Sequence, residues 1–127
     1  MEMYTLALQR SFTARHFLTG GDWGPENEVH AHPYRAEIRL RARNLDEHGF
    51  IVDLEKLEAC LDGCVARYRD RVLNDLPEFK GINPSIEHFS RVFFERLAQS
   101  LEVGDVDRVE IRIWENDSAW ASYGEPR

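Results

Sequence analysis

Two long stretches of alternating side chains constrain the fold of this 127-residue chain more than any other feature. Within residues 30–43, the even positions carry imidazole, aromatic or aliphatic groups: His30, His32, Tyr34, Ala36, Ile38, Leu40 and Ala42. Residues 3–17 alternate in the same way, and their even positions end at His16. Because successive side chains of a strand point to opposite faces, each stretch predicts a long β-strand with one buried face. Arg10 interrupts the first apolar face, which indicates either a bulge or a functional charge that points inward.

The other segments complete an α+β pattern. They are a loop rich in glycine over residues 18–27, a helix over 54–68 capped by Asp53, a second helix opened by Asn83, Pro84 and Ser85, and two strands over 106–115 and 119–123. The order β-β-α-α-β-β predicts one domain, 1–127, in which two helices cover one face of a four-stranded antiparallel sheet. Since strands of this length leave long edges exposed, we expect the chain to form a homo-oligomer by edge pairing.

Composition narrows the class of protein. Hydrophobic residues make up 43% of the chain, enough for a core, and the formal net charge is -7. An acidic chain without a long apolar run is a poor candidate for binding nucleic acid or a membrane. The N-terminus does not resemble a signal peptide, and Cys60 and Cys64 are expected to be reduced packing residues. These features predict a cytoplasmic protein.

Three histidines carry the strongest chemical signal. His30 and His32 lie two residues apart and therefore share one face of a strand, and His16 lies on the same kind of face at the end of the neighbouring strand. Three converging imidazoles form a good zinc site, and a fourth position is then open for water or substrate. The alternative is that these histidines only pack in the core. His48 and His88 are expected to lie at the surface.

Six short segments, in order along nearly the whole chain, add a further signal. They are Phe-Thr-Ala-Arg-His at 12–16, His-Ala-His-Pro-Tyr at 30–34, Gly-Phe-Ile-Val-Asp-Leu at 49–54, Leu-Asn-Asp at 73–75, Asn-Pro-Ser-Ile-Glu at 83–87 and Trp-Glu at 114–115. They resemble the motifs of the 6-pyruvoyltetrahydropterin and 6-carboxytetrahydropterin synthase family. The resemblance implies the tunnelling fold, a β-β-α-α-β-β subunit whose sheets join into a barrel, and a trimer-based oligomer that reaches a hexamer in some cases.

The resemblance also implies roles for individual residues. His16, His30 and His32 would be the zinc ligands, Ser85 would belong to the substrate-binding residues, and Glu115 would anchor the pterin ring. A carboxylate suits that last role because it accepts two parallel hydrogen bonds from a ring N–H and an exocyclic amino group. The alternative for Glu115 is a strand end whose carboxylate lies in solvent.

The chain departs from the family pattern at the catalytic positions. Typical members carry a cysteine shortly before the paired histidines, where this chain has Glu26 and Glu28, and an Asp-His pair where this chain has Arg69 and Asp70. A subgroup with glutamate at the cysteine position is associated with cleavage of the dihydroneopterin side chain. We therefore take Glu26, Glu28 and Asp70 as candidate catalytic residues, with a carboxylate as general base. A solvated acidic loop is the alternative for the two glutamates.

Together these features predict a zinc-dependent lyase that acts on the side chain of 7,8-dihydroneopterin or its triphosphate, by carbon–oxygen or carbon–carbon cleavage. The alternative is a family member that binds a pterin or a purine-like ligand without the classical catalysis. A weaker alternative is a structural oligomer without a metal.

Overall fold

The computed structural model describes residues 2–127, so Met1, the first residue of the predicted domain, lies outside the described part. Its helices and strands follow the predicted order: β1 (Tyr4–His16), β2 (His30–Ala42), α1 (Leu54–Tyr68), α2 (Ile86–Ala98), β3 (Arg108–Asn116) and β4 (Ala119–Pro126). The strands form one antiparallel sheet in the order β1-β2-β3-β4. The α+β prediction is confirmed.

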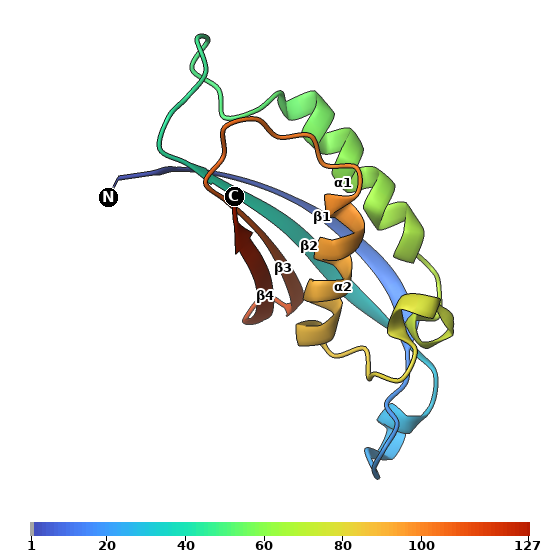
Figure 1. Ribbon diagram of the computed structural model, residues 1–127. Coiled ribbons are helices and arrows are strands. Elements are labelled where there is room, and N and C mark those ends of the chain that lie inside the picture. The colour runs from blue at the N-terminus through green and yellow to red at the C-terminus, as the bar shows by residue number, and fades with distance from the viewer. Residues whose placement is uncertain (1) are drawn as a thin grey trace.

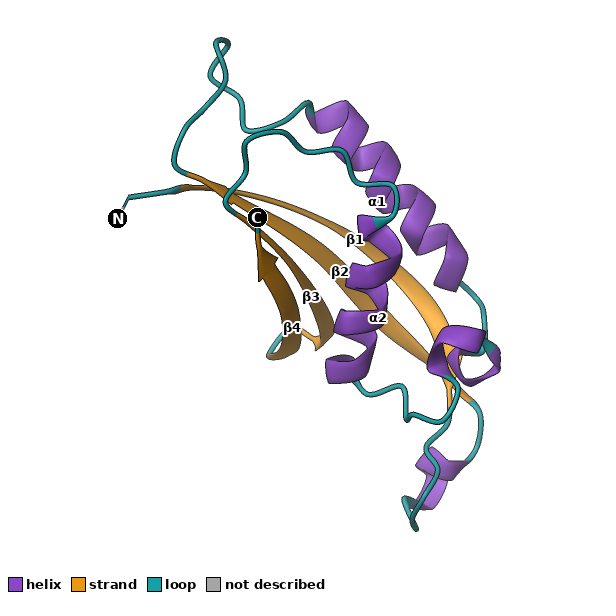
Figure 2. Cartoon of the chain, in the orientation of Figure 1, coloured by secondary structure: helices purple, strands orange, loops and turns teal. Residues whose placement is uncertain are grey.

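Both helices cover the same face of the sheet (Figure 2). The helix α1 contacts β1, and α2 contacts β3 and β4. Each helix begins at a side-chain cap, since Asp53 accepts from the amides of Glu55 and Lys56 and Ser85 accepts from the amide of His88. Neither helix has the length and apolar character needed to cross a membrane.

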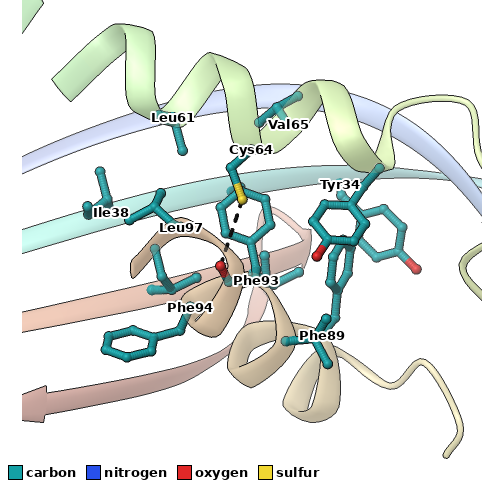
Figure 3. Packing of buried hydrophobic residues seen from close by; sticks show 14 of the residues in the cluster. Tyr34, Ile38, Leu61, Cys64, Val65, Phe89, Phe93, Phe94 and Leu97 are labelled. Carbon is teal, nitrogen blue, oxygen red and sulfur yellow. Dashed lines mark hydrogen bonds between the residues drawn. The ribbon is translucent and has the colours of Figure 1, made fainter. Parts of the chain in front are cut away.

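The core lies between the helices and the even positions of the first two strands. Side chains of α1 and α2 meet over the sheet, including Leu61, Cys64 and Phe93 (Figure 3). Ile38 and Leu40 of β2 are fully buried beneath them, and burial of such a side chain contributes about 1.5–3 kcal/mol. Burial also raises the pKa of the Cys64 thiol, which fits its predicted role as a packing residue.

Two local expectations need correction. The loop over residues 18–27 contains a short 3-10 helix, Gly24–Asn27, because Pro25 is suited to a first helical turn. Arg10 does not mark a bulge, since the pairing of β1 with β2 is continuous there. Its guanidinium instead lies 2.8 Å from Asp62 and 3.1 Å from Glu58, both on α1, so that it ties the helix to the sheet.

Candidate active site

His16 and His30 face each other at one end of the sheet. They are direct partners in the ladder between β1 and β2, and the connection between these strands extends beyond this end (Figure 1). The two Nε2 atoms lie 2.9 Å apart, and the His16 ring is almost completely buried. Two imidazole nitrogens bound to one zinc ion lie about 3.3 Å apart in a tetrahedral site, so this pair is close to a ligand arrangement.

The tautomer of His30 follows from the hydrogen bond that its second ring nitrogen, Nδ1, makes. Nδ1 lies 2.9 Å from the backbone carbonyl oxygen of Glu28. A carbonyl only accepts hydrogen bonds, so Nδ1–H is the donor, and Nε2 of the neutral ring carries a lone pair. Orientation of a histidine by a second partner is typical of metal ligands.

His16 is held neutral by its surroundings. Burial, together with the neighbouring His30 and His32, lowers the pKa of His16 to about 4. Its Nδ1 lies 2.6 Å from the hydroxyl oxygen of Tyr34, a buried tyrosine whose own pKa is raised, chiefly by burial. A metal ligand must be a neutral imidazole near pH 7, and His16 meets this condition.

Glu26 is the third member of the cluster. Its carboxylate lies 3.6 Å from Nε2 of His30, on the short helix Gly24–Asn27. One ligand atom each from His16, Glu26 and His30 lie within 4.8 Å of one another. Two imidazoles and a carboxylate fit zinc well, which accepts both nitrogen and oxygen ligands.

His32 lies beside this cluster rather than within it. Its ring centroid is 5.6 Å from that of His16, but its Nε2 lies 3.7 Å from the carboxylate of Glu115. Its Nδ1 is buried and has no hydrogen-bond partner among the described residues. A buried polar atom without a hydrogen-bond partner is rare in a folded protein. The unpartnered Nδ1 of His32 therefore fits a ring that binds a further ligand.

Glu115 lines a cavity of about 480 Å³ and brings it next to one histidine, His32, whose Nε2 lies 3.7 Å from the Glu115 carboxylate. The cavity is lined from β1, β2 and the β3–β4 hairpin, and its walls include Phe12, Tyr34 and Trp114. Glu115 continues the inward phase of Ile111 and Ile113, and a bulge between Trp114 and Asn116 interrupts the ladder with β4 at this residue. Trp114 and one carboxylate suit a flat heterocycle with N–H donors, whereas the rings of Phe12 and Tyr34 are buried against Phe89 of α2.

Three other candidates lie outside this arrangement. The side chain of Glu28 is exposed, and the residue acts on His30 through its carbonyl. Asp70 has a φ of 61°, and its amide donates to the carbonyl of Thr13 at the free edge of β1. Ser85 caps α2 through its hydroxyl. The described contacts connect none of these three side chains to Glu26 or Glu115.

Sequence reasoning missed Tyr34 as a partner of His16. The signal was present, because Tyr34 continues the alternation of His30 and His32 and therefore points to the same face. The register pairs Tyr34 with Phe12, four residues before His16, which brings the hydroxyl within reach of the imidazole. Only the register of the two strands fixes this contact.

Comparisons with known proteins agree with the fold. Residues 5–126 match the family model described as 6-pyruvoyl tetrahydropterin synthase. A dihydroneopterin monophosphate aldolase from Pyrococcus furiosus is 28% identical over 107 residues, which cover 84% of this chain and 85% of that protein.

Two solved structures show the same fold. The 6-pyruvoyl tetrahydropterin synthase of Caenorhabditis elegans superposes with a TM-score of 0.82 at 24% identity, over 97% of this chain and 96% of that one. The Plasmodium vivax enzyme, in a variant whose catalytic residue, a glutamate, is replaced by alanine, gives 0.79 at 17% identity over 100% of both chains.

Proposed function

This chain belongs to the 6-pyruvoyl tetrahydropterin synthase family, and we propose that within it the protein is a zinc-dependent lyase that cleaves a carbon–carbon bond in the side chain of a phosphorylated 7,8-dihydroneopterin. The observation that carries the proposal is the carboxylate of Glu26, 3.6 Å from Nε2 of His30, in a chain that has no cysteine before its paired histidines. The Pyrococcus furiosus relative, a dihydroneopterin monophosphate aldolase, favours carbon–carbon over carbon–oxygen cleavage. A glutamate is also the catalytic residue of the Plasmodium vivax enzyme.

The metal site in this proposal is formed by His16, His30 and His32. The first two already converge, and the buried, unpartnered Nδ1 of His32 is consistent with a ring that turns toward them. Zinc bound there would polarise the hydroxyl oxygens of the substrate side chain. Glu26 then lies beside the metal as a general base rather than as a ligand.

The cavity that Glu115 lines would hold the pterin ring. Glu115 accepts hydrogen bonds from the ring N–H and the exocyclic amino group, and Trp114 supplies an apolar wall. Because Glu115 lies 3.7 Å from His32, a ring anchored there directs its side chain toward the histidine cluster. Ser85 is kept as a candidate for substrate binding, and Asp70 replaces Glu26 as the candidate base if loss of the Glu26 carboxylate leaves turnover unchanged.

The reaction balances with Glu26 as the only proton carrier. Glu26 takes the proton of the 2′-hydroxyl group, the C1′–C2′ bond breaks, and C2′ becomes the aldehyde carbon of glycolaldehyde phosphate. The bonding electrons pass to C1′ and are delocalised into the C6=N5 bond of the ring. Return of the proton from Glu26 to C1′ gives 6-hydroxymethyl-7,8-dihydropterin, so no oxidant or further reactant is needed.

Incubation with dihydropterins tests the proposal. Protein purified without chelator is analysed for metal and incubated separately with 7,8-dihydroneopterin, its monophosphate and its triphosphate, and the products are identified by mass. About one zinc per chain and release of 6-hydroxymethyl-7,8-dihydropterin are expected. Loss of triphosphate from the third substrate would instead show carbon–oxygen cleavage. Binding without any conversion would show a pterin-binding protein that lacks the catalysis.

A further inference from the structure

Tyr34, His16, His30 and Glu28 form one continuous chain of hydrogen bonds. The hydroxyl of Tyr34 lies 2.6 Å from Nδ1 of His16, Nε2 of His16 lies 2.9 Å from Nε2 of His30, and Nδ1 of His30 lies 2.9 Å from the carbonyl oxygen of Glu28. This series of hydrogen bonds contains only one group that cannot donate, the backbone carbonyl of Glu28 at its end. The direction of every hydrogen bond follows from that group.

With both rings neutral, the donor and the acceptor of each hydrogen bond can be assigned in turn, starting from the carbonyl. The carbonyl of Glu28 accepts from Nδ1–H of His30, so Nε2 of His30 is an acceptor. Nε2 of His16 must then donate across the 2.9 Å contact, and Nδ1 of His16 carries the lone pair. In the metal-free protein, the hydroxyl of Tyr34 therefore donates a hydrogen bond to Nδ1 of His16.

Metal binding requires the other tautomer of His16. For Nε2 of His16 to bind a metal it must carry the lone pair, so its proton moves to Nδ1. The group that faces Nδ1 must then accept a hydrogen bond. A hydroxyl serves as donor or acceptor by rotation about one bond, whereas a carbonyl or carboxylate only accepts and an amide N–H only donates.

Packing fixes the place of this hydroxyl. Tyr34 is 3% exposed, its ring stacks on Phe12 at 5.7 Å, and Phe89 meets it edge-on at 5.3 Å (Figure 3). Three elements, β1, β2 and α2, therefore hold the ring. Replacement by phenylalanine keeps these ring contacts and removes the hydroxyl alone.

We propose that Tyr34 is a positioning residue that holds His16 in one tautomer when the site is empty and in the other when the site binds its metal. The inference rests on the proposed metal site, but it concerns a residue that is neither a proposed metal ligand nor the proposed base. Without the hydroxyl, Nδ1–H of His16 would be buried without an acceptor in the metal-bound state. Loss of such an outer partner typically weakens metal binding about 10–100-fold.

Two variants test the role of the hydroxyl. Zinc affinity is measured by competition with a chromophoric chelator for the parent protein, Tyr34→Phe and Tyr68→Phe. Tyr68 is a matched control, because its buried hydroxyl donates to Glu78 and its ring contacts the same Phe89, away from the histidines. We expect Tyr34→Phe to lose about 10–100-fold in zinc affinity and Tyr68→Phe to keep the affinity of the parent. Equal affinities of the parent and Tyr34→Phe would overturn the inference.

A spectroscopic readout separates this inference from the proposed function. Imidazole ¹⁵N spectra of the metal-free parent are expected to show His16 protonated at Nε2, and zinc is expected to move that proton to Nδ1. If metal-free His16 is protonated at Nδ1, the inference is wrong even when zinc binds. If zinc does not bind to the parent at all, the proposed zinc enzyme fails together with the metal-bound half of the inference.

Discussion

Glu26 combines two properties that decide its role. Its side chain is 55% exposed and therefore open to solvent, and its carboxylate lies within 4.8 Å of the ligand atoms of His16 and His30. In the proposed zinc site, a carboxylate in this position would either bind the metal or move a proton beside it. The two roles differ in what happens when the carboxylate is made neutral.

Glu26→Gln is expected to lower turnover by about 10²–10⁴-fold, the loss that accompanies removal of a general base. The zinc content should stay at the level of the parent, because three imidazoles remain. Steady-state kinetics and metal analysis of the same preparations test both statements. Glu28→Gln is the control, since its backbone carbonyl still orients His30 and its exposed carboxylate is lost. A zinc-free Glu26→Gln protein would make Glu26 a ligand instead of the base.

Glu115→Gln is expected to weaken pterin binding by more than it weakens folding. The carboxamide keeps the shape of the side chain, but one of its two acceptors becomes a donor that faces a donor of the ring. The side chain is 46% exposed, so the free energy of unfolding should change little. Titration with a dihydropterin and urea denaturation of both proteins compare the two effects. Unchanged affinity would remove Glu115 from the binding site.

The alternation of side chains along the strands predicted the positions of His16 and His30, whereas the structure of the loop determined the position of Glu26. His16 and His30 face each other because both continue an alternation that the sequence displays, and the register of two antiparallel strands does the rest. The position of Glu26 depends on Asn27, whose side chain bonds Trp23, Leu18 and Gly21. Such a loop has no period, so the sequence indicated Glu26 only by resemblance.

The C-terminal end of α1 is joined to the segment Pro77–Phe79 by a charged contact. Glu78 lies 2.8 Å from the guanidinium of Arg67 and 3.0 Å from the hydroxyl of Tyr68. Its hydrogen bond with Arg67 is the largest of the effects that lower the pKa of Glu78, to about 2. Because the folded state favours the charged carboxylate, this contact stabilises the protein only where Glu78 is ionised.

The stability of the protein should therefore fall in acid. The ordinary pKa of Glu78 is 4.5 and the folded value is about 2, so its contribution is complete above about pH 4.5 and is lost as the pH falls to about 2. At about 1.4 kcal/mol per pKa unit, the contribution is at most about 3 kcal/mol, and solvent screening of these partly exposed side chains reduces it. Urea denaturation between pH 3 and pH 7 should show this slope for the parent and a weaker one for Glu78→Gln. Glu95→Gln, which removes an exposed ion pair with Arg91, should keep the slope of the parent.

The elements themselves followed from period and caps, to within a few residues. Asp53 caps the first helix as expected, and Ser85, the last residue of the predicted opening segment 83–85, caps the second, because a side-chain oxygen can satisfy the free amides of a first turn. The partners of Arg10 did not follow, since α1 lies far along the chain from β1 and its rotation about the helix axis is set by packing. Local pattern predicts an element, whereas contacts between distant elements need the folded chain.

The sheet that the described residues form has two edge strands, β1 and β4. At one end of β1, the amide of Arg15 donates to the carbonyl of Arg71, and the carbonyl of Thr13 accepts from Asp70. Odd residues of β1 therefore direct their backbone groups away from β2, as alternation in an antiparallel ladder requires. Within the described residues no strand pairs with this edge before Thr13, so residues 5–11 remain available to a second copy.

We propose that β1 of one subunit pairs with β4 of the next and that three subunits close a barrel, and proline at Gln9 tests this. Gln9 is an odd residue, so its amide points away from β2 and its loss removes no bond of the subunit's own ladder. The extended backbone before it also suits a residue that precedes proline. Gln9→Pro should therefore fold, as judged by circular dichroism, but sediment as a monomer where the parent sediments as a trimer or hexamer. Gln9→Ala keeps the amide and should assemble like the parent. Leu8→Pro removes an amide that bonds to β2 and should therefore unfold. If Gln9→Pro sediments with the parent, the subunits meet through another surface, and the free edge of β1 has no role in assembly.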